Sequence, residues 1–157
     1  LSYFGEFGKQ GTGYAVQHLV VQLRRILKME SQWDVVLVGA GDLGHALTHY
    51  NGFAPAGFRI TAVYDNDERK VGQLMAGLEI RDSRRLRSEA ARCGFRVGIL
   101  AVPASGAQEV ANELIAGGVR AILNYAPITL AVPDGVRVEY VDPVVYLQRM
   151  TFYVQPD

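Results

Sequence analysis

The feature that most constrains the fold is the hexapeptide "GAGDLG", which directly follows an apolar run at residues 35–38. Glycines in the spacing Gly-x-Gly-x-x-Gly suit a turn from a β-strand into an α-helix that holds a dinucleotide. The first glycine permits the tight turn, the second lets a pyrophosphate approach the backbone, and the third lets the helix pack closely on the sheet. The sequence therefore predicts a phosphate-binding loop composed of Gly39, Ala40, Gly41, Asp42, Leu43 and Gly44.

The residues around this loop strengthen the prediction, because the spacing alone is weak in a chain with 17 glycines. Asp65 ends a second apolar segment, residues 58–65, and lies 21 residues beyond Gly44. At that distance a carboxylate accepts hydrogen bonds from the adenosine ribose hydroxyls. Residues 66–68 read Asn-Asp-Glu and contain no arginine that would receive a 2′-phosphate. We therefore expect the cofactor to be NAD(H) rather than NADP(H).

Strand and helix patterns alternate along the rest of the chain, which indicates βαβ units, right-handed crossovers and a parallel sheet. Ser83 is the expected N-cap of the first helix in this part, and Gly94 its stop. The fold class is therefore α/β, a Rossmann-type doubly wound parallel sheet over residues 31–141. The predicted elements are a helix over 83–94, a strand over 95–103, a helix over 104–118, and strands over 119–127 and 136–142.

The residues that leave the later strands are candidate ligand contacts, because ligands of open α/β sheets lie across the carboxyl ends of the strands. The segment "AVP" at residues 101–103 is expected to border the nicotinamide half of the pocket, and "NYAP" leaves the next strand. Asn124 in the second segment is a candidate hydrogen-bond partner of the carboxamide or of a ribose. The alternative is that both segments are ordinary proline-containing loops.

Both ends of the chain carry further helical patterns. Residues 15–30 predict an amphipathic linking helix with one apolar stripe. Near the other end, Asp142 is an expected N-cap and Pro143 the first helical residue. Apolar residues cover most of the circumference of this helix, so it needs burial on several sides. We expect residues 142–157 to pack across the interface of a homodimer and to be exchanged; the alternative is cover by the helix's own domain.

The composition excludes several classes of protein. The 16 Lys and Arg residues balance 16 Asp and Glu residues, so net charge argues neither for nor against nucleic acid. A single cysteine, Cys93, permits no intramolecular disulfide, and three histidines without ligand spacing predict no metal site. No apolar run is long enough to cross a membrane and no signal peptide opens the chain. We expect a cytoplasmic protein with no membrane partner.

Catalytic groups are not evident in the sequence. A dehydrogenase needs a substrate domain and a proton donor beside the nicotinamide. His18, His45 and His49 all fall at polar positions of predicted helices, and few residues follow the last predicted strand. We therefore predict no catalytic residues and a protein that binds the cofactor without transforming it, rather than an enzyme.

Seven segments together resemble the Rex family of redox-sensing transcriptional repressors. They are "LSYFGEFGKQGTGY", "VVLVGAGDLGHAL", "YNGF", "VYDND", "AVP", "ILNYAP" and "VEYVD", in this order along the chain. The resemblance implies a homodimer whose subunits combine a winged-helix DNA-binding domain, a Rossmann NAD(H) domain and an exchanged C-terminal helix. It also implies repression when NADH is scarce and release of operator DNA when NADH binds.

The resemblance assigns further roles. Residues 1–14 would be the wing of the winged-helix domain, with Lys9 near a DNA phosphate, and no counterpart of the upstream recognition helix is found in the 157 residues. Tyr50 and Asp142 would form the switch pair near the nicotinamide. Asp42 stands where the family often has a basic or amide residue, so we expect its carboxylate to point away from the pyrophosphate. The nicotinamide would be bordered by Val102, Pro103, Asn124, Tyr125 and Ala126.

Two other functional classes stay open. One is a fragment of a small NAD-dependent oxidoreductase, which would transfer hydride to a carbonyl substrate. The other is a ligand-sensing module of the potassium-channel regulatory type, which would not need the glycine- and aromatic-rich segment at residues 3–14.

Overall fold

The computed structural model describes residues 13–27 and 32–154, and the chain divides into two compact units, Leu1–Gln32 and Trp33–Asp157. In the first unit, helix α2 spans Gly13–Leu27 and confirms the helix expected near residues 15–30. Because α2 begins at Gly13, the expected wing hairpin cannot extend beyond residue 12. The rest of that hairpin, with Lys9, lies outside the described residues.

The second unit is built on a seven-stranded sheet with the order β3-β4-β2-β1-β5-β6-β7. All neighbouring strands are parallel except β3 and β4, which are antiparallel. The strand order reverses at β1, between β2 and β5, which creates the switch point where doubly wound sheets bind ligands. The Rossmann-type prediction is thus confirmed. The strands are β1 (Trp33–Val38), β2 (Phe58–Asp65), β3 (Leu74–Met75), β4 (Leu78–Asp82), β5 (Val97–Leu100), β6 (Ala121–Asn124) and β7 (Arg137–Tyr140).

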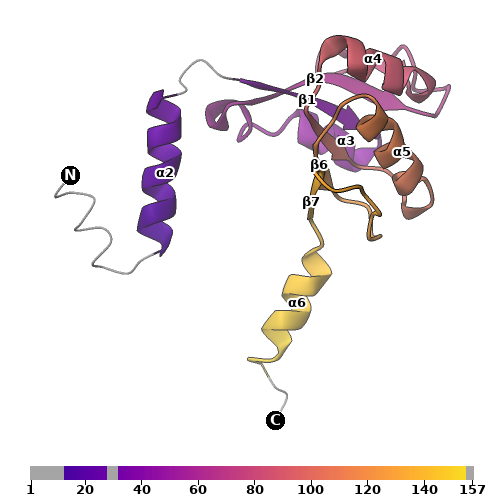
Figure 1. Cartoon of the computed structure of the whole chain (residues 1–157). Coiled ribbons are helices and arrows are strands. Elements are labelled where there is room, and N and C mark those ends of the chain that lie inside the picture. The colour runs from indigo at the N-terminus through magenta and orange to yellow at the C-terminus, as the bar shows by residue number, and fades with distance from the viewer. Residues whose placement is uncertain (1–12, 28–31, 155–157) are drawn as a thin grey trace. The chain divides into compact units, whose positions relative to one another are not determined.

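Helices cover both faces of this sheet (Figure 1). Alternate residues of β1 point to opposite faces, so Val36 packs with one buried cluster and Leu37 with the other. The first cluster includes side chains of α4 and α5, and the second includes Leu47 of α3. The helices of the second unit are α3 (Asp42–Thr48), α4 (Leu86–Cys93), α5 (Ala104–Ala116) and α6 (Pro143–Thr151), with short 3₁₀ turns η1 (Ala54–Ala56) and η2 (Ser83–Arg85).

The region between β2 and α4 differs from the expectation. The sequence predicts no strand there, yet β3 and β4 form an antiparallel pair that joins the sheet through β4. Ser83 is also not the N-cap that was predicted. The Asp82 side chain instead accepts a hydrogen bond of 2.9 Å from the Arg84 backbone N–H, and the chain enters α4 through η2. Asp82 precedes Ser83 in the chain, and its carboxylate accepts from the backbone N–H at the start of η2, so Asp82 takes the capping position that was expected for Ser83.

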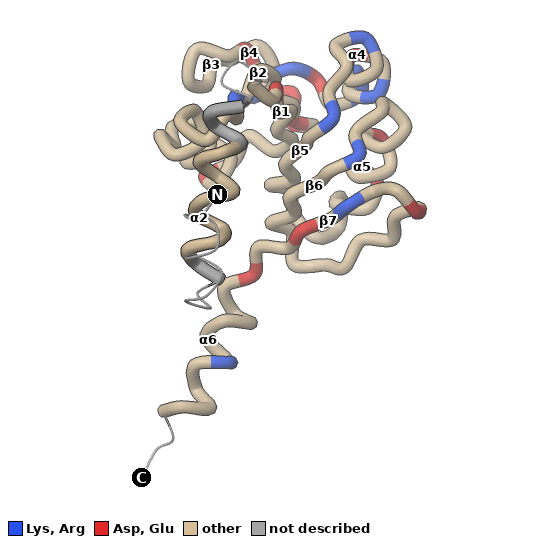
Figure 2. Tube along the Cα trace, turned by 60° about the vertical axis from the view of Figure 1, so that its left-hand side comes forward, with Lys and Arg blue, Asp and Glu red and all other residues tan. Residues whose placement is uncertain are grey.

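Helix α6 has the predicted start, with the Asp142 carboxylate accepting from the Val144 backbone N–H at 3.0 Å and Pro143 at the first position. None of its residues is buried, so the unit's own sheet does not cover it. Arg149 is its one charged residue (Figure 2). Among the residues that the structure describes, no helix is both long and apolar enough to span a membrane. The exposed apolar side chains at this end are Val144, Val145, Tyr146, Leu147, Met150, Phe152, Tyr153 and Val154.

Candidate dinucleotide-binding site

The three glycines of the loop between β1 and α3 occupy three different environments. Gly39 has φ +114°, and a Cβ there would overlap the carbonyl oxygen of Ala101 at the end of β5. A Cβ on Gly44 would overlap the carbonyl oxygen of Gly39. A Cβ on Gly41 would meet no atom within 4 Å. The first and third glycines therefore serve backbone packing, whereas the second leaves open space in front of the first turn of α3, where the helix amides attract an anion.

Asp65, the expected ribose ligand, also organises this loop. Its side chain is buried, with 9% exposure. One carboxylate oxygen accepts from the Ala40 backbone N–H and the other from the Asp67 backbone N–H, both at 2.7 Å. The Gly39 N–H donates to the Tyr64 carbonyl at 2.8 Å, which ties the loop to β2 a second time. Each carboxylate oxygen keeps a further lone pair, which leaves Asp65 able to accept from ribose hydroxyls.

A groove of about 740 Å³ runs along the carboxyl ends of the strands beside this loop. Its walls come from the glycine loop, the exit of β2, the η2 turn, the exit of β5 and the first half of α5. Five predicted cofactor contacts line this groove: Gly39, Gly41, Asp65, Val102 and Pro103. Its volume lies within the range of small-molecule and cofactor pockets.

Asp42 does not line the groove and is exposed in the first turn of α3. That its carboxylate points away from a pyrophosphate stays a prediction. Leu43 is also exposed, while Gly44 is buried beneath the loop.

Asn124 is hydrogen-bonded within its own loop. The side chain is 1% exposed and outside the groove lining. Its amide nitrogen donates to the carbonyls of Ala126 and Ile128 at 3.2 and 3.1 Å, and its amide oxygen accepts from the Ala126 N–H at 2.8 Å. Both amide protons are therefore used within the chain, so Asn124 shapes the loop after β6, and its contact with the carboxamide or a ribose stays a prediction.

Tyr50 and Tyr125 lie close enough to interact electrostatically. Burial, and then the Tyr50 hydroxyl, raise the pKa of Tyr125. The Tyr50 ring is 60% exposed and meets Phe53 edge to face, with ring centroids 4.9 Å apart. The Asp142 carboxylate bonds the Val144 amide at the start of α6. Within residues 32–154 no hydrogen bond joins Tyr50 and Asp142 in the single chain, and their pairing as a switch stays a prediction.

Two cations that the sequence analysis did not assign to the site, Lys70 and Arg84, also line the groove. The Arg84 guanidinium is held by Asp82, with its Nε 3.1 and 2.9 Å from the two carboxylate oxygens. These bonds and the Arg84 backbone N–H lower the pKa of Asp82 to about 2. No local motif could have revealed this cation, because the pairing of β4 with β2 brings Arg84 beside Asp65.

The two histidines of the second unit do not line the groove. His45 and His49 have ring centroids 5.1 Å apart at the exposed side of α3, and neither lines the groove. Over residues 13–27 and 32–154, no group of three or more His, Cys, Asp and Glu side chains is arranged to hold a metal ion.

Comparisons with known proteins agree with this geometry. The model of the CoA binding domain family matches residues 30–128. A redox-sensing transcriptional repressor Rex of Chloroflexus aggregans is 51% identical over 154 residues, which cover 98% of this chain and 73% of that protein. Its counterpart in Roseiflexus is 46% identical over 157 residues, or 71% of its length.

Solved structures give the same relationship. The crystal structure of RSP, a Rex-family repressor, matches with a TM-score of 0.77 and 32% identity over 88% of this chain and 66% of that one. RSP has also been solved with β-NADH, and with β-NAD⁺ and operator DNA, with TM-scores of 0.77 and 0.78. A UDP-D-quinovosamine 4-dehydrogenase from Vibrio fischeri, 18% identical with a TM-score of 0.53, shares the fold alone. The chain spans about two thirds of the length of the RSP chains.

Proposed function

Because the chain belongs to the Rex family of redox-sensing transcriptional repressors and, through residues 30–128, to the CoA binding domain family, we propose that it senses NADH and NAD⁺ for a homodimeric repressor. The cofactor lies in the groove at the carboxyl ends of β1, β2 and β5. NADH binding releases the operator. NAD⁺ occupies the same groove but favours the DNA-incompetent arrangement of the dimer less than NADH does.

The observation that carries this proposal is the joint geometry of the glycine loop and Asp65. The open space at Gly41 receives the pyrophosphate, in front of the amides of α3. Asp65, anchored to the loop through Ala40, accepts from the adenosine ribose. The nicotinamide half then extends toward Val102 and Pro103, with Tyr125 and Ala126 beyond them.

The sensing mechanism is a shift between two arrangements of the dimer. NADH releases DNA only if it binds the DNA-incompetent arrangement more tightly than the competent one. Thermodynamic linkage then requires operator DNA to weaken NADH binding by the same factor. We assign the DNA contact to the wing at residues 1–12, with Lys9 on a phosphate, the subunit contact to residues 142–157, and the coupling to Tyr50 and Asp142.

We also propose that the chain is not an enzyme and acts in the cytoplasm, where operator DNA is found. The names of its relatives, which are repressors, support this reading. An assay of NADH oxidation with a panel of carbonyl substrates tests it. Turnover with any of them would favour the small NAD-dependent oxidoreductase.

The decisive experiment measures NADH affinity with and without operator. It uses a version of the protein that carries a complete winged-helix domain, titrated with NADH and with NAD⁺ by calorimetry. We expect NADH to bind more weakly when the operator is present, and NAD⁺ to change less. Equal NADH affinity in the two titrations would rule out the sensor mechanism.

A further inference from the structure

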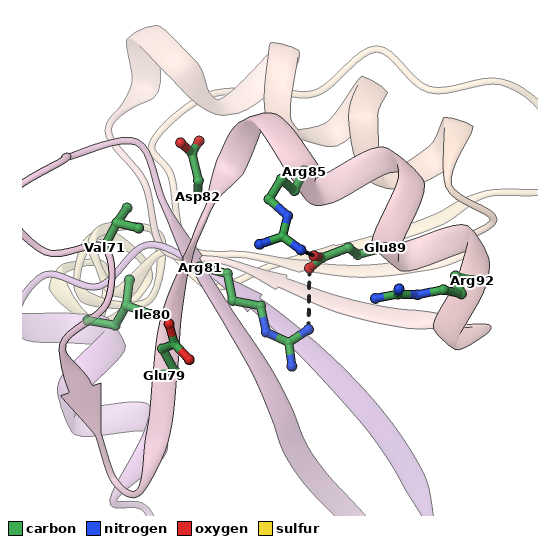
Figure 3. A pocket seen from close by; sticks show the side chains of 8 residues that line it. All are labelled: Val71, Glu79, Ile80, Arg81, Asp82, Arg85, Glu89 and Arg92. Atoms are coloured by element: carbon green, nitrogen blue, oxygen red, sulfur yellow. Dashed lines mark hydrogen bonds and ion pairs between the residues drawn. The ribbon is translucent and has the colours of Figure 1, made fainter.

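A second cavity, of about 310 Å³, lies on the α4 side of β4 and shares no lining residue with the dinucleotide groove. Figure 3 shows the side chains of Arg81, Arg85 and Arg92 directed toward Glu89 from β4, η2 and α4. The groove and this second cavity are separated by the η2 turn, since Asp82 and Arg85 line one, and Ser83 and Arg84 the other.

The carboxylate at the centre of this cluster, that of Glu89, already has a partner on each oxygen. Glu89 is 4% exposed. One of its oxygens is 2.6 Å from a terminal nitrogen of Arg85, and the other accepts from the Tyr64 hydroxyl and, at 3.3 Å, from Arg81. Burial alone would raise the pKa of Glu89, but these donors and positive charges together lower it. Glu89 therefore stays ionised and uses only part of the donor capacity around it.

The three guanidinium groups have hydrogen-bond donors to spare. Each guanidinium carries five N–H groups. Toward the described residues, Arg81 uses only Nη1, which faces Glu89 and the Tyr64 hydroxyl, and Arg85 uses only Nη2. Arg92 forms no hydrogen bond or ion pair with any residue in the described part of the chain. Two cations thus share one buried anion, and the third has no anionic partner among the described residues.

The other two carboxylates that line the cavity form no ion pair with these three arginines in the described part of the chain. Asp82 is already engaged by Arg84 on the far side of the turn. Glu79 is exposed and makes no ion pair in residues 13–27 and 32–154. A cavity with unused guanidinium donors complements a compact oxyanion, because guanidinium forks bind phosphate and carboxylate oxygens with two parallel bonds.

We propose that this cavity is a phosphate site, which takes inorganic phosphate or the phosphate group of a monoester. Arg92 contributes a guanidinium charge that has no carboxylate partner among the described residues. Arg81 and Arg85 contribute the N–H groups that Glu89 does not use. Glu89 holds those two arginines in place from the buried side. The site does not depend on the proposed cofactor function, because it shares no residue with the groove.

The test follows backbone amide NMR signals of the full chain, saturated with NADH so that the pyrophosphate position in the groove is occupied. The probes are sodium phosphate, glycerol phosphate and, at equal ionic strength, sodium chloride. We expect saturable shifts confined to residues 79–92 with both phosphates and none with chloride. Tighter binding of glycerol phosphate would identify a monoester as the ligand, and equal binding would identify inorganic phosphate.

Two variants make the test specific. Arg92→Gln removes the guanidinium that lacks a partner and should weaken phosphate binding about tenfold, since hydrogen bonds to charged groups are the strong ones. Arg96→Gln removes an exposed arginine that does not line the cavity and should bind phosphate like the wild type. Shifts that chloride reproduces, or that Arg92→Gln leaves unchanged, would overturn the proposal. Saturation with NADH is monitored separately, at residues 39–44.

Discussion

At the scale of single residues, the glycines of the phosphate loop have different roles: Gly44 is needed for the packing of the fold, and Gly41 for the approach of the cofactor. Gly44→Ala places a methyl group against the Gly39 carbonyl, so the loop or the helix must shift. We expect a loss of about 1–3 kcal/mol of unfolding free energy, typical of overpacking. Thermal unfolding followed by circular dichroism measures this loss.

Gly41→Ala is the matched control for that substitution. Its methyl group meets no protein atom within 4 Å, so the fold should keep its stability. The methyl group does enter the space assigned to the pyrophosphate, and NADH affinity should fall at least about tenfold, as expected for a lost backbone approach. Unchanged NADH affinity in Gly41→Ala would contradict this placement of the cofactor.

Asp82 is expected to contribute to the discrimination between NADH and NADPH, because it pairs with Arg84, which lines the groove. Asp82→Asn keeps an acceptor for the Arg84 amide but removes the charge that holds the guanidinium. We expect NADPH affinity to rise about two- to fivefold while NADH affinity stays the same, since exposed ion pairs contribute up to about 1 kcal/mol. Titrations at low salt measure both constants.

Adding Arg84→Gln to this variant should abolish the gain in NADPH affinity. If the double variant keeps the gain, another group of the groove, such as Lys70, receives the 2′-phosphate. NADPH should stay the weaker ligand throughout, because the Asp65 carboxylate still repels a phosphate beside it.

The residues of the groove differ in how well the sequence predicts their positions. Gly41 and Asp65 line the groove as predicted because their spacing follows from one strand–turn–helix unit. The end of a strand predicts Asn124 as a ligand contact, whereas the bonds of its amide to the backbone two and four residues later depend on the shape of the loop, which the sequence does not reveal. Arg84 was not assigned to the groove, because only the register between β2 and β4 brings it there.

At the scale of elements, α4 is fixed to the sheet through a buried polar cluster. Tyr64 of β2 and Arg81 of β4 both bond Glu89 of α4. Burial, and then the bond to Glu89, raise the pKa of Tyr64 to about 12, so this tyrosine donates throughout the neutral range. The cluster joins three elements that are distant in the sequence.

Glu89→Gln should destabilise the fold in a pH-dependent manner. The pKa of Glu89 lies below its ordinary value of 4.5, so its charged form stabilises the native state above that pH, and this contribution is lost as pH falls through the native pKa. We expect the variant to lose about 1–3 kcal/mol at pH 7, with the difference from wild type shrinking below pH 4.5. Urea unfolding between pH 3 and 8 measures it.

The control for that series is Glu139→Gln, which removes an exposed partner of Arg137 on β7. Exposed ion pairs contribute little, so its unfolding curves should follow those of the wild type at every pH. A constant difference between Glu89→Gln and wild type down to pH 3 would mean that packing, rather than charge, accounts for the loss.

Elements differ in how far the sequence predicts them. β2 spans Phe58–Asp65, as its apolar pattern indicates, because it is central and its later residues are buried. β4 was not predicted because its alternating segment "LEIRD" has only five residues, and its neighbour β3, at the edge of the sheet, has only two. Edge strands take their structure from their neighbours, so their own composition carries a weak signal.

At the scale of the whole molecule, α6 is a helix whose apolar side chains lack cover. Leu147 and Met150, one turn apart, are 59% and 60% exposed in the single chain. Because a second subunit is the proposed cover, Leu147→Asp combined with Met150→Asp should raise the dimer dissociation constant at least about a hundredfold, as expected for charges buried at the centre of an interface. Light scattering after size exclusion measures the mass across a dilution series.

The control for the dimer is Leu74→Asp, which places the same charge on a side chain that is 73% exposed on β3. It should remain as dimeric as the wild type. The α6 variant should also keep its fold and its NADH affinity, because none of its substituted side chains is buried in the chain itself or lines the groove. A dimer that survives both substitutions in α6 would place the subunit interface on another surface, and the helix would then need a different partner to cover it.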